Sequence, residues 1–478
     1  MVFTTHIFVF YFLPLVLLLY YAAGWSLGVA GVSHQGIVRL RNGLLFAASC
    51  LFYGWWEPWY VLLILAVIVL NYFCGMIIAA GHRPLQRATL LLAVVFNLGA
   101  LALFKYAVFL QDNLNQVLGW LGTTQFRTVQ IVLPIGISFY IFQATSYTVD
   151  VYRGVAPAAR SLADFACYVS MFPQLVAGPI VRYNTVAQQL LARDHSCERF
   201  ASGVALFVLG FAKKILLANP IGLAADAAFN ARQLTLIDAW FGAAAYGFQI
   251  YFDFSGYSDM AVGLGRIFGF ELPANFNSPY LAESITDFWR RWHISLSTFL
   301  RDYLYIPLGG NRKGPRRTYV NLMIVMLLGG LWHGANWTFV AWGAYHGLLL
   351  AVERLLGKRS MYQWLPRPAR IAATFLLVLF SWVLFRSASL AEACHYLRAM
   401  FTAGAGGQSA LLLAAQLYAR GPLLAMAACA LLAFQRRQSQ HWAERLDWCK
   451  AVLLAVTFSV SLVAMFSQSF NPFLYFQF

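Results

Sequence analysis

The stretch YVNLMIVMLLGGLWHGANWTFVAWGAYHGLLLAV (residues 319–352) contains no Asp, Glu, Lys or Arg. Basic residues stand on both sides of it: Arg312, Lys313, Arg316, Arg317, Arg354, Lys358 and Arg359. Because Lys and Arg collect on the cytoplasmic side of a membrane, both ends of the stretch are expected there. The stretch is too long for one crossing of about 20 residues. We therefore predict a hairpin or re-entrant pair that bends near Gly329, Gly330 and Gly334.

The rest of the chain is also apolar. Of its 478 residues, 60% are hydrophobic and 11% are charged, whereas soluble domains are about 45–50% apolar. Further runs with few or no charges occur at 7–21, 61–71, 90–110, 371–386, 411–434 and 451–467. We predict an all-α, polytopic membrane protein with about 10–12 transmembrane or re-entrant helices, forming one domain over residues 1–478.

The loops between the first runs alternate in charge. Basic residues occur in every second loop: Arg39, Arg41, Arg83, Arg87, Arg153 and Arg160. This alternation predicts an N-terminus on the outer side, and the absence of Lys and Arg from MVFTTHIFVF (1–10) predicts a retained first span rather than a cleaved signal peptide. The net charge of +16 thus reflects basic residues in cytoplasmic loops that lie next to membrane lipid. Nucleic-acid binding is not expected.

Polar residues also lie inside apolar runs. Asp253, Ser255 and Tyr257 belong to YFDFSGYSDMAVGLG (251–265). Groups at such a depth face a protein interior or a wet cavity rather than lipid. We expect Asp253 to be hydrogen-bonded to a nearby Arg or Lys, and a direct substrate role for the three residues is the alternative.

Two of the nine histidines stand in unusual surroundings. His333 lies in GGLWHGAN (329–336), where glycines allow backbone and substrate to approach closely. His293 lies in one predicted amphipathic helix at 285–305. The residues that share its apolar face are Trp289, Leu296 and Leu300. A neutral imidazole takes a proton from an attacking hydroxyl and returns it to a leaving thiolate, and an interhelical hydrogen bond is the alternative role.

Other candidate residues surround these two. His346, in AYHG, is expected to form a hydrogen bond or to lie at the lipid interface rather than to act in catalysis. Arg290, Arg291 and Arg301 are suited to a phosphate-bearing donor such as coenzyme A, although lipid headgroups and carboxylates are commoner partners. The chain has no C-x-x-C pair, no H-E-x-x-H motif and no G-x-x-x-x-G-K-[ST] loop. We therefore predict no metal site and no bound cofactor.

Several segments together resemble the membrane-bound O-acyltransferase family, in the branch similar to the membrane subunits that acetylate bacterial alginate and cellulose. They are LPIGISFYIFQATSYTVDVYRG (133–154), FPQLVAGPIVRY (172–183), YFDFSGYSDMAVGLG (251–265), ANFNSPYLAESITDFWRRWHISLSTFLRDYLYIPLGGNRKG (274–314), LLGGLWHGANWTFVAWG (327–343) and NPFLYFQF (471–478). The motif core thus covers about 133–347, and the C-terminal helices at 371–467 resemble the family in hydropathy only.

The resemblance implies a function. The histidine of the WHG motif, His333, corresponds to the central catalytic residue, and that of the RRWH motif, His293, to its partner. It also implies helices around a central tunnel, location in the bacterial inner membrane, and a periplasmic esterase-like partner that passes the acyl group to an exopolysaccharide. The expected donor is acetyl-CoA, with D-alanyl transfer to a cell-wall polymer or a non-enzymatic transporter as alternatives. The residues expected to contact substrate are Asn336, Trp332, Arg290, Arg291, Asp253, Ser255 and Tyr257.

Overall fold

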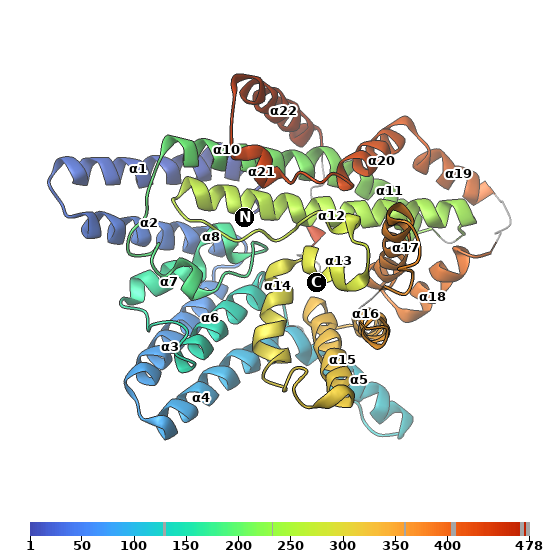
Figure 1. Cartoon of the computed structure of the whole chain (residues 1–478), viewed down its shortest axis with the longest axis horizontal. Helices are drawn as coiled ribbons and strands as arrows, with labels where there is room; N and C mark the ends of the chain where they lie inside the picture. The colour runs from blue at the N-terminus through green and yellow to red at the C-terminus, as the bar shows by residue number, and fades with distance from the viewer. Residues whose placement is uncertain (128–130, 232, 358–359, 403–407, 469–472, 475–478) are drawn as a thin grey trace. The chain divides into compact units, whose positions relative to one another are not determined.

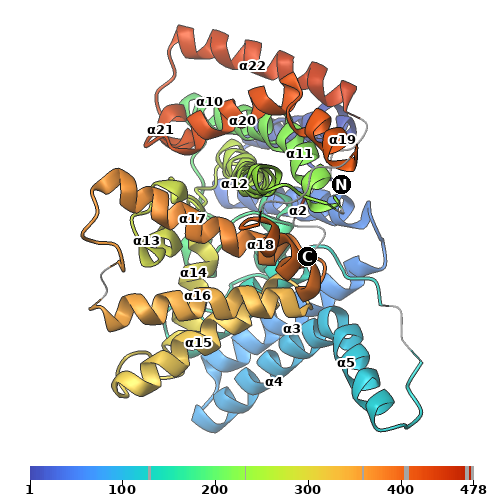
Figure 2. The same cartoon turned by 90° about the vertical axis from the view of Figure 1, so that its right-hand side faces the viewer.

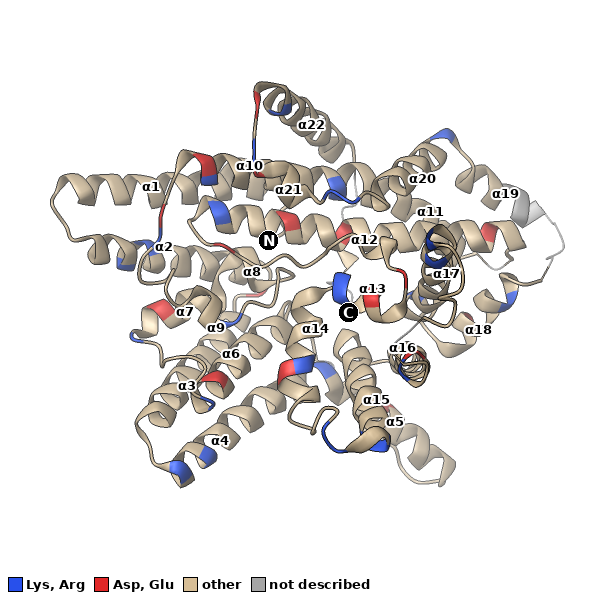
Figure 3. Cartoon of the chain, in the orientation of Figure 1, with Lys and Arg blue, Asp and Glu red and all other residues tan. Residues whose placement is uncertain are grey.

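The computed structural model describes residues 1–127, 131–231, 233–357, 360–402, 408–468 and 473–474. Within these ranges every regular element is a helix and none is a strand, which confirms the predicted all-α class. Among the described residues, six helical stretches are long and apolar enough to cross a membrane: Phe8–Val29, Tyr60–Ala80, Arg83–Trp120, Cys197–Phe229, Arg367–Arg386 and Trp448–Ser467. Lys and Arg gather at helix ends and in loops, for example at the beginning of the helix α4 (Arg83–Leu101) (Figure 3).

The chain divides into two compact units, one formed by Met1–Phe207 with Met260–Pro273 and the other by Val208–Asp259 with Ala274–Phe478. The chain passes from one unit to the other inside α10 (Cys197–Ala212), inside α12 (Leu236–Ile267) and after Pro273. The prediction of a single domain over residues 1–478 stays a prediction.

The first unit is built from helices of the N-terminal part of the chain. Besides its parts of α10 and α12 it contains η1 (Phe8–Phe12), α1 (Leu13–Val29), α2 (His34–Gly54), α3 (Tyr60–Ala80), α4 (Arg83–Leu101), η2 (Ala102–Tyr106), α5 (Ala107–Trp120), α6 (Ile137–Tyr152), α7 (Leu162–Ser170), α8 (Phe172–Leu175) and α9 (Tyr183–Val186). Asn71 of α3 and Asn97 of α4 exchange two side-chain hydrogen bonds of 2.9 Å. Such amide pairs hold apolar helices together where apolar packing alone gives little specificity.

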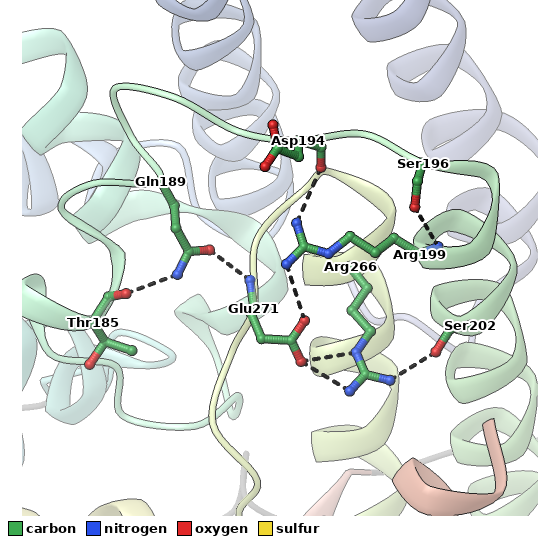
Figure 4. A network of polar contacts seen from close by, with 8 residues as sticks. All are labelled: Thr185, Gln189, Asp194, Ser196, Arg199, Ser202, Arg266 and Glu271. Atoms are coloured by element: carbon green, nitrogen blue, oxygen red, sulfur yellow. Dashed lines mark hydrogen bonds and ion pairs between the residues drawn. The ribbon is translucent and has the colours of Figure 1, made fainter. Parts of the chain in front are cut away.

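In the first unit, a polar network joins the loop after α9, the beginning of α10 and the segment after α12 (Figure 4). Arg266 donates to Glu271 Oε1 at 3.0 and 3.1 Å and to Ser202 Oγ at 2.8 Å. Gln189 Oε1 accepts from the Glu271 backbone N–H at 2.7 Å, and Arg199 lies 3.9 Å from the same carboxylate. The network fixes the segment after α12 to the beginning of α10.

The second unit contains the helices of the motif core and of the C-terminal part. Besides its parts of α10 and α12 these are η3 (Lys213–Ala218), α11 (Asn219–Phe229), η4 (Pro279–Leu281), α13 (Ile285–Arg291), α14 (Ile294–Leu300), η5 (Arg301–Tyr305), α15 (Gly314–His333), α16 (Trp337–Leu355), α17 (Arg367–Arg386), α18 (Leu390–Ala399), α19 (Gln408–Leu417), α20 (Arg420–Ala433), α21 (Ser439–Ala443) and α22 (Trp448–Ser467). The predicted simple span at 411–434 is wrong, because the chain breaks between α19 and α20. The helices α15 and α16 lie side by side (Figures 1 and 2).

Candidate active site

The predicted hairpin around His333 is confirmed, but its bend lies later than expected. The helix α15 ends at His333 and α16 begins at Trp337, so Gly329 and Gly330 are helical and the turn is formed by Gly334–Asn336. A Cβ atom at Gly330 would meet the carbonyl oxygen of Phe339, which shows how closely the two backbones approach. Gly330 therefore serves close helix packing, whereas Gly334, the third glycine of the predicted bend, lies in the turn.

Asn336 closes the turn. Its Oδ1 accepts from the Thr338 backbone N–H at 3.1 Å as an N-cap of α16. Its Nδ2 donates to the Ala388 carbonyl oxygen at 2.9 Å. The amide oxygen of Asn336 thus caps α16, and its amide nitrogen ties the turn to the segment after α17. The expected contact of Asn336 with substrate stays a prediction.

His333 lies in an aromatic setting. Its residue is 4% exposed, and its ring centroid is 5.0 Å from Trp332, 5.2 Å from Trp342 and 5.1 Å from Phe385, all near edge-on. The imidazole also lines a cavity of about 410 Å³. A titratable group that faces an apolar cavity is a candidate for proton transfer.

This cavity lies between α13, α14 and η5 on one side and α15 and α16 on the other. Its lining follows α15 from Leu322 to His333, a distance of roughly 16 Å at about 1.5 Å per residue. The basic residues that line it are Arg290, Arg301 and Arg354. Because Arg354 stands at the far end of α16 from the turn beside His333, the cavity has an imidazole at one end and a cation at the other.

His293 occupies a break that the sequence pattern did not predict. The single helix expected over 285–305 is wrong: α13 ends at Arg291, and His293 itself has a positive φ of 44° before α14 begins. A non-glycine residue adopts this backbone only where its surroundings enforce it. His293 therefore does not share with Trp289 the one continuous apolar helix face that the sequence pattern had predicted.

Asn275 supplies that enforcement. Its Oδ1 accepts from the Ser295 backbone N–H at 3.1 Å and from Ser295 Oγ at 2.9 Å, and lies 3.2 Å from His293 Nδ1. The Asn275 carbonyl oxygen accepts from the Ile294 N–H at 2.9 Å. The segment before α13 thus fixes both the break and the orientation of the imidazole.

His293 is fully buried, and this burial lowers its pKa to about 3. The imidazole is therefore neutral near pH 7. Its ring lies 4.7 Å from the Phe254 ring and 5.9 Å from Trp332, measured between centroids. Trp332 touches the rings of both histidines, so it is the side chain that connects His293 to the cavity residue His333.

The two arginines of the RRWH motif differ in their surroundings. Arg290 is exposed and lines the cavity. Arg291 pairs with Asp287 at 2.9 Å, one helical turn earlier, and does not line the cavity. Arg301 pairs with Asp302 at 2.6 Å while it also contributes to the lining. Arg291 is thus paired with a carboxylate, which was the commoner of the roles expected for these arginines.

The residues of the 251–265 motif lie outside the cavity lining. Asp253 Oδ1 forms an ion pair of 2.5 Å with Lys214, and its Oδ2 accepts from the Leu474 N–H at 2.9 Å. The expectation that Asp253 pairs with a nearby basic residue is therefore confirmed. Tyr257 and Ser255 are buried in α12, and a substrate role for the three residues stays a prediction.

Two further residues of α16 hold the site together. The fully buried Glu353 accepts hydrogen bonds from the backbone N–H groups of Ile285 and Thr286 at 2.7 and 2.8 Å, and from Thr286 Oγ1 at 2.7 Å. His346 Nδ1 lies 3.3 Å from Trp289 Nε1, which confirms its expected hydrogen-bonding role. Both contacts attach α13 to α16. Sequence reasoning missed Glu353, although an acidic residue in an apolar helix was a usable signal.

Comparison with known proteins shows which families and proteins this chain resembles. Residues 153–391 match the family model for MBOAT, membrane-bound O-acyltransferases. The chain is 45% identical to a probable alginate O-acetylase of Pseudomonas putida over 500 aligned residues, which cover 100% of both chains. It is 34% identical to a peptidoglycan O-acetyltransferase of Helicobacter pylori, covering 100% of this chain and 98% of that protein. A teichoic acid D-alanyltransferase of Streptococcus thermophilus is 30% identical over 46% of this chain and 56% of its own.

Proposed function

The chain belongs to the membrane-bound O-acyltransferase family, and on this premise we propose that it transfers an acetyl group from a thioester donor in the cavity that His333 lines. It is a multi-pass membrane protein and an O-acyltransferase. The sequence-based resemblance is thereby confirmed, and the alternative of a non-enzymatic transporter is set aside.

The cavity itself supports the choice of donor. Acetyl-CoA carries an acyl thioester at one end and phosphates at the other. The cavity has His333 at one end and the guanidinium of Arg354 toward the other, and Arg290 and Arg301 also line it. Guanidinium groups bind phosphate through paired N–H donors. The single observation that carries the proposal is this placement of the imidazole and the arginines along one cavity.

The proposed chemistry is general-base catalysis. The imidazole of His333 accepts the proton of an acceptor hydroxyl while the hydroxyl oxygen attacks the thioester carbonyl. The tetrahedral intermediate then collapses, the carbon–sulfur bond breaks, and the thiolate leaves with the proton that the imidazole returns. His293, held by Asn275 and touching Trp332, orients the residues beside the reacting group.

The relatives support a proposal for the acceptor and the location. Proteins named for O-acetylation of alginate and of peptidoglycan match this chain over its whole length. We therefore propose an exopolysaccharide such as alginate or cellulose as the final acceptor, reached through a periplasmic esterase-like partner. The protein is then placed in the bacterial inner membrane with its N-terminus in the periplasm, in agreement with the loop charges.

The test is donor turnover by purified protein in lipid nanodiscs. Acetyl-labelled acetyl-CoA and a hydroxyl acceptor, alginate with the periplasmic esterase-like partner, are added to the wild type, His333→Ala and His293→Ala, with the exposed His395→Ala as the matched control. General-base assistance contributes about 10²- to 10⁴-fold, so release of free CoA should fall by that order in His333→Ala and stay normal in the control. Thermal unfolding of each variant separates lost chemistry from lost folding.

Two outcomes contradict the proposal. Normal CoA release by a folded His333→Ala variant removes this residue from the chemistry. Inactivity of the wild type with acetyl-CoA, together with turnover of a D-alanyl thioester, favours the second candidate. That candidate is motivated by the similarity to a teichoic acid D-alanyltransferase over 46% of the chain.

A further inference from the structure

A second cavity of about 370 Å³ lies in the same unit but shares no lining residue with the first. It is bounded by η3, by α12, and by the segment that joins α20 to α22 through α21. Most of its lining residues are apolar, among them Leu216 and Leu217 of η3 and Leu453 and Leu454 of α22. An apolar cavity of this size accommodates a hydrocarbon chain.

The rim of this cavity is polar and basic. Lys213, Arg437, Gln438 and Ser439 contribute to the lining, and no Asp or Glu is among the described residues that do. Lys213 is held by Asp259 at 2.7 Å, so its position is fixed. Arg437 is exposed, at the end of α20 where the chain turns toward α21. The charge of Lys213 is thus matched by Asp259, whereas Arg437 gives the lining a cation, and Gln438 and Ser439 add hydrogen-bond donors.

The cavity borders a helix that faces lipid. Only 17% of the apolar window of α22 is buried within the protein, so the remainder is available to bilayer chains. Trp442 lines the cavity beside the basic segment 436–450. Trp is typical of the membrane interface, and basic clusters next to a span attract anionic headgroups.

We propose that this second cavity binds one anionic phospholipid. Its phosphate lies against Arg437, its other headgroup oxygens accept from Ser439 and Gln438, and an acyl chain lies along the apolar residues of η3 and α22. The lining combines a cation that suits a phosphate with apolar side chains, and it includes residues of a helix that is mostly unburied. This combination favours a phospholipid over a soluble anion.

The rim is also connected to His293. Ser278 Oγ donates to the Gln435 carbonyl oxygen at 2.8 Å and accepts from Gln438 Nε2 at 2.5 Å. Ser278 has a positive φ of 46° and lies three residues after Asn275, whose side chain holds His293. Lipid at the rim should therefore steady the segment that orients His293. This second part of the inference rests on the proposed function, whereas lipid binding does not.

Binding is tested without any acyl donor. Nanodiscs of phosphatidylcholine with increasing phosphatidylglycerol are compared, and retained lipid is counted by native mass spectrometry. Arg437→Gln should weaken phosphatidylglycerol binding about fivefold, since one basic residue near a membrane surface contributes on that order. Arg436→Gln, an exposed neighbour that does not line the cavity, is the matched control. Thr457→Trp fills the apolar part of the cavity and should exclude the lipid.

The binding proposal fails if Arg437→Gln and Arg436→Gln retain the same amount of lipid, or if phosphatidylcholine binds equally well. The connection to His293 is tested by CoA release in the same discs, which should rise with phosphatidylglycerol in the wild type and not in Thr457→Trp. Lipid bound without a change in turnover contradicts the connection alone. No turnover in any lipid, with lipid bound, contradicts the proposed function instead.

Discussion

Two polar sites in the second unit lie in similarly apolar surroundings and differ in what their side chains face. Asp253 of α12 is closed off by the ammonium of Lys214 and the N–H of Leu474. His333, at the end of α15, lines a cavity of about 410 Å³. Burial of a polar group alone therefore does not identify a reactive site. A group whose charge is matched within the chain holds the fold, whereas a group that faces open volume has room for a substrate.

The largest expected effect on stability comes from the matched pair. Lys214→Met leaves the carboxylate of Asp253 buried without its cation, and removal of one partner of a buried pair costs about 3–5 kcal/mol because the remaining charge is uncompensated. Thermal unfolding in detergent should show a large loss of stability. The double variant Lys214→Met with Asp253→Asn should regain most of it. A double variant as unstable as the single one would contradict a structural role and reopen the substrate role of Asp253.

Gly330→Ala probes the close packing of α15 against α16, the two helices that bound one side of the cavity. The added Cβ would meet the backbone oxygen of Phe339 on α16, so α15 and α16 must separate. Overpacking of this kind costs about 1–3 kcal/mol and should also reduce acetyl transfer by displacing His333. Gly329→Ala is the control, because its Cβ would meet only a flexible atom of Leu300, at 3.3 Å. Equal stability of the two variants would show that the close approach at Gly330 is not required.

Arg290→Gln tests the basic lining directly. An exposed ion pair contributes about 0.2–1 kcal/mol, so the KM for acetyl-CoA should rise by up to about fivefold with little change in kcat. The expected increase shrinks at high salt, because exposed charges are screened. Arg316→Gln removes an exposed arginine at the beginning of α15 that does not line the cavity. A kcat effect without a KM effect would place Arg290 outside donor binding.

The smallest expected effect on stability concerns an ion pair near the surface. Unlike the buried pair of Asp253 and Lys214, it is screened by solvent. Glu283 accepts from Arg367 at 2.7 Å and from Arg370 at 2.6 Å, and the hydrogen bond from Arg367 is the main cause that lowers its pKa. Because the folded pKa is the lower one, the pair stabilises the protein above the ordinary value near 4.5, and the effect is lost as pH falls through the folded pKa.

Glu283→Gln should therefore reduce stability by less than about 1 kcal/mol at pH 7. The difference from the wild type should disappear in acid. Thermal unfolding measured from pH 7 to pH 3 checks both statements, with the exposed Glu444→Gln as the control. A difference that persists at pH 3 would contradict the assignment to this ion pair.

Much of this protein is determined by its sequence alone. The apolar runs predicted a helical membrane protein, and the uncharged stretch at 319–352 with basic ends predicted the hairpin of α15 and α16. The pairing of Asp253 with a lysine followed from the cost of leaving a charge unmatched in an apolar run. The motif segments indicated the family. These features depend on the local composition of each segment and on the transfer of apolar segments from water into the bilayer. Neither requires contacts between distant parts of the chain.

Only the tertiary structure decided where the reactive groups lie. The break at His293 depends on Asn275, which bonds to Ser295 across 20 positions of sequence, and no helical periodicity reveals it. The attachment of α13 depends on Glu353, 68 positions after Ile285. The cavity with His333 and the arginines exists because α13 and α14 pack against α15 and α16. Hydropathy places helices in a membrane, whereas hydrogen bonds between distant segments set the angles and breaks that create a site.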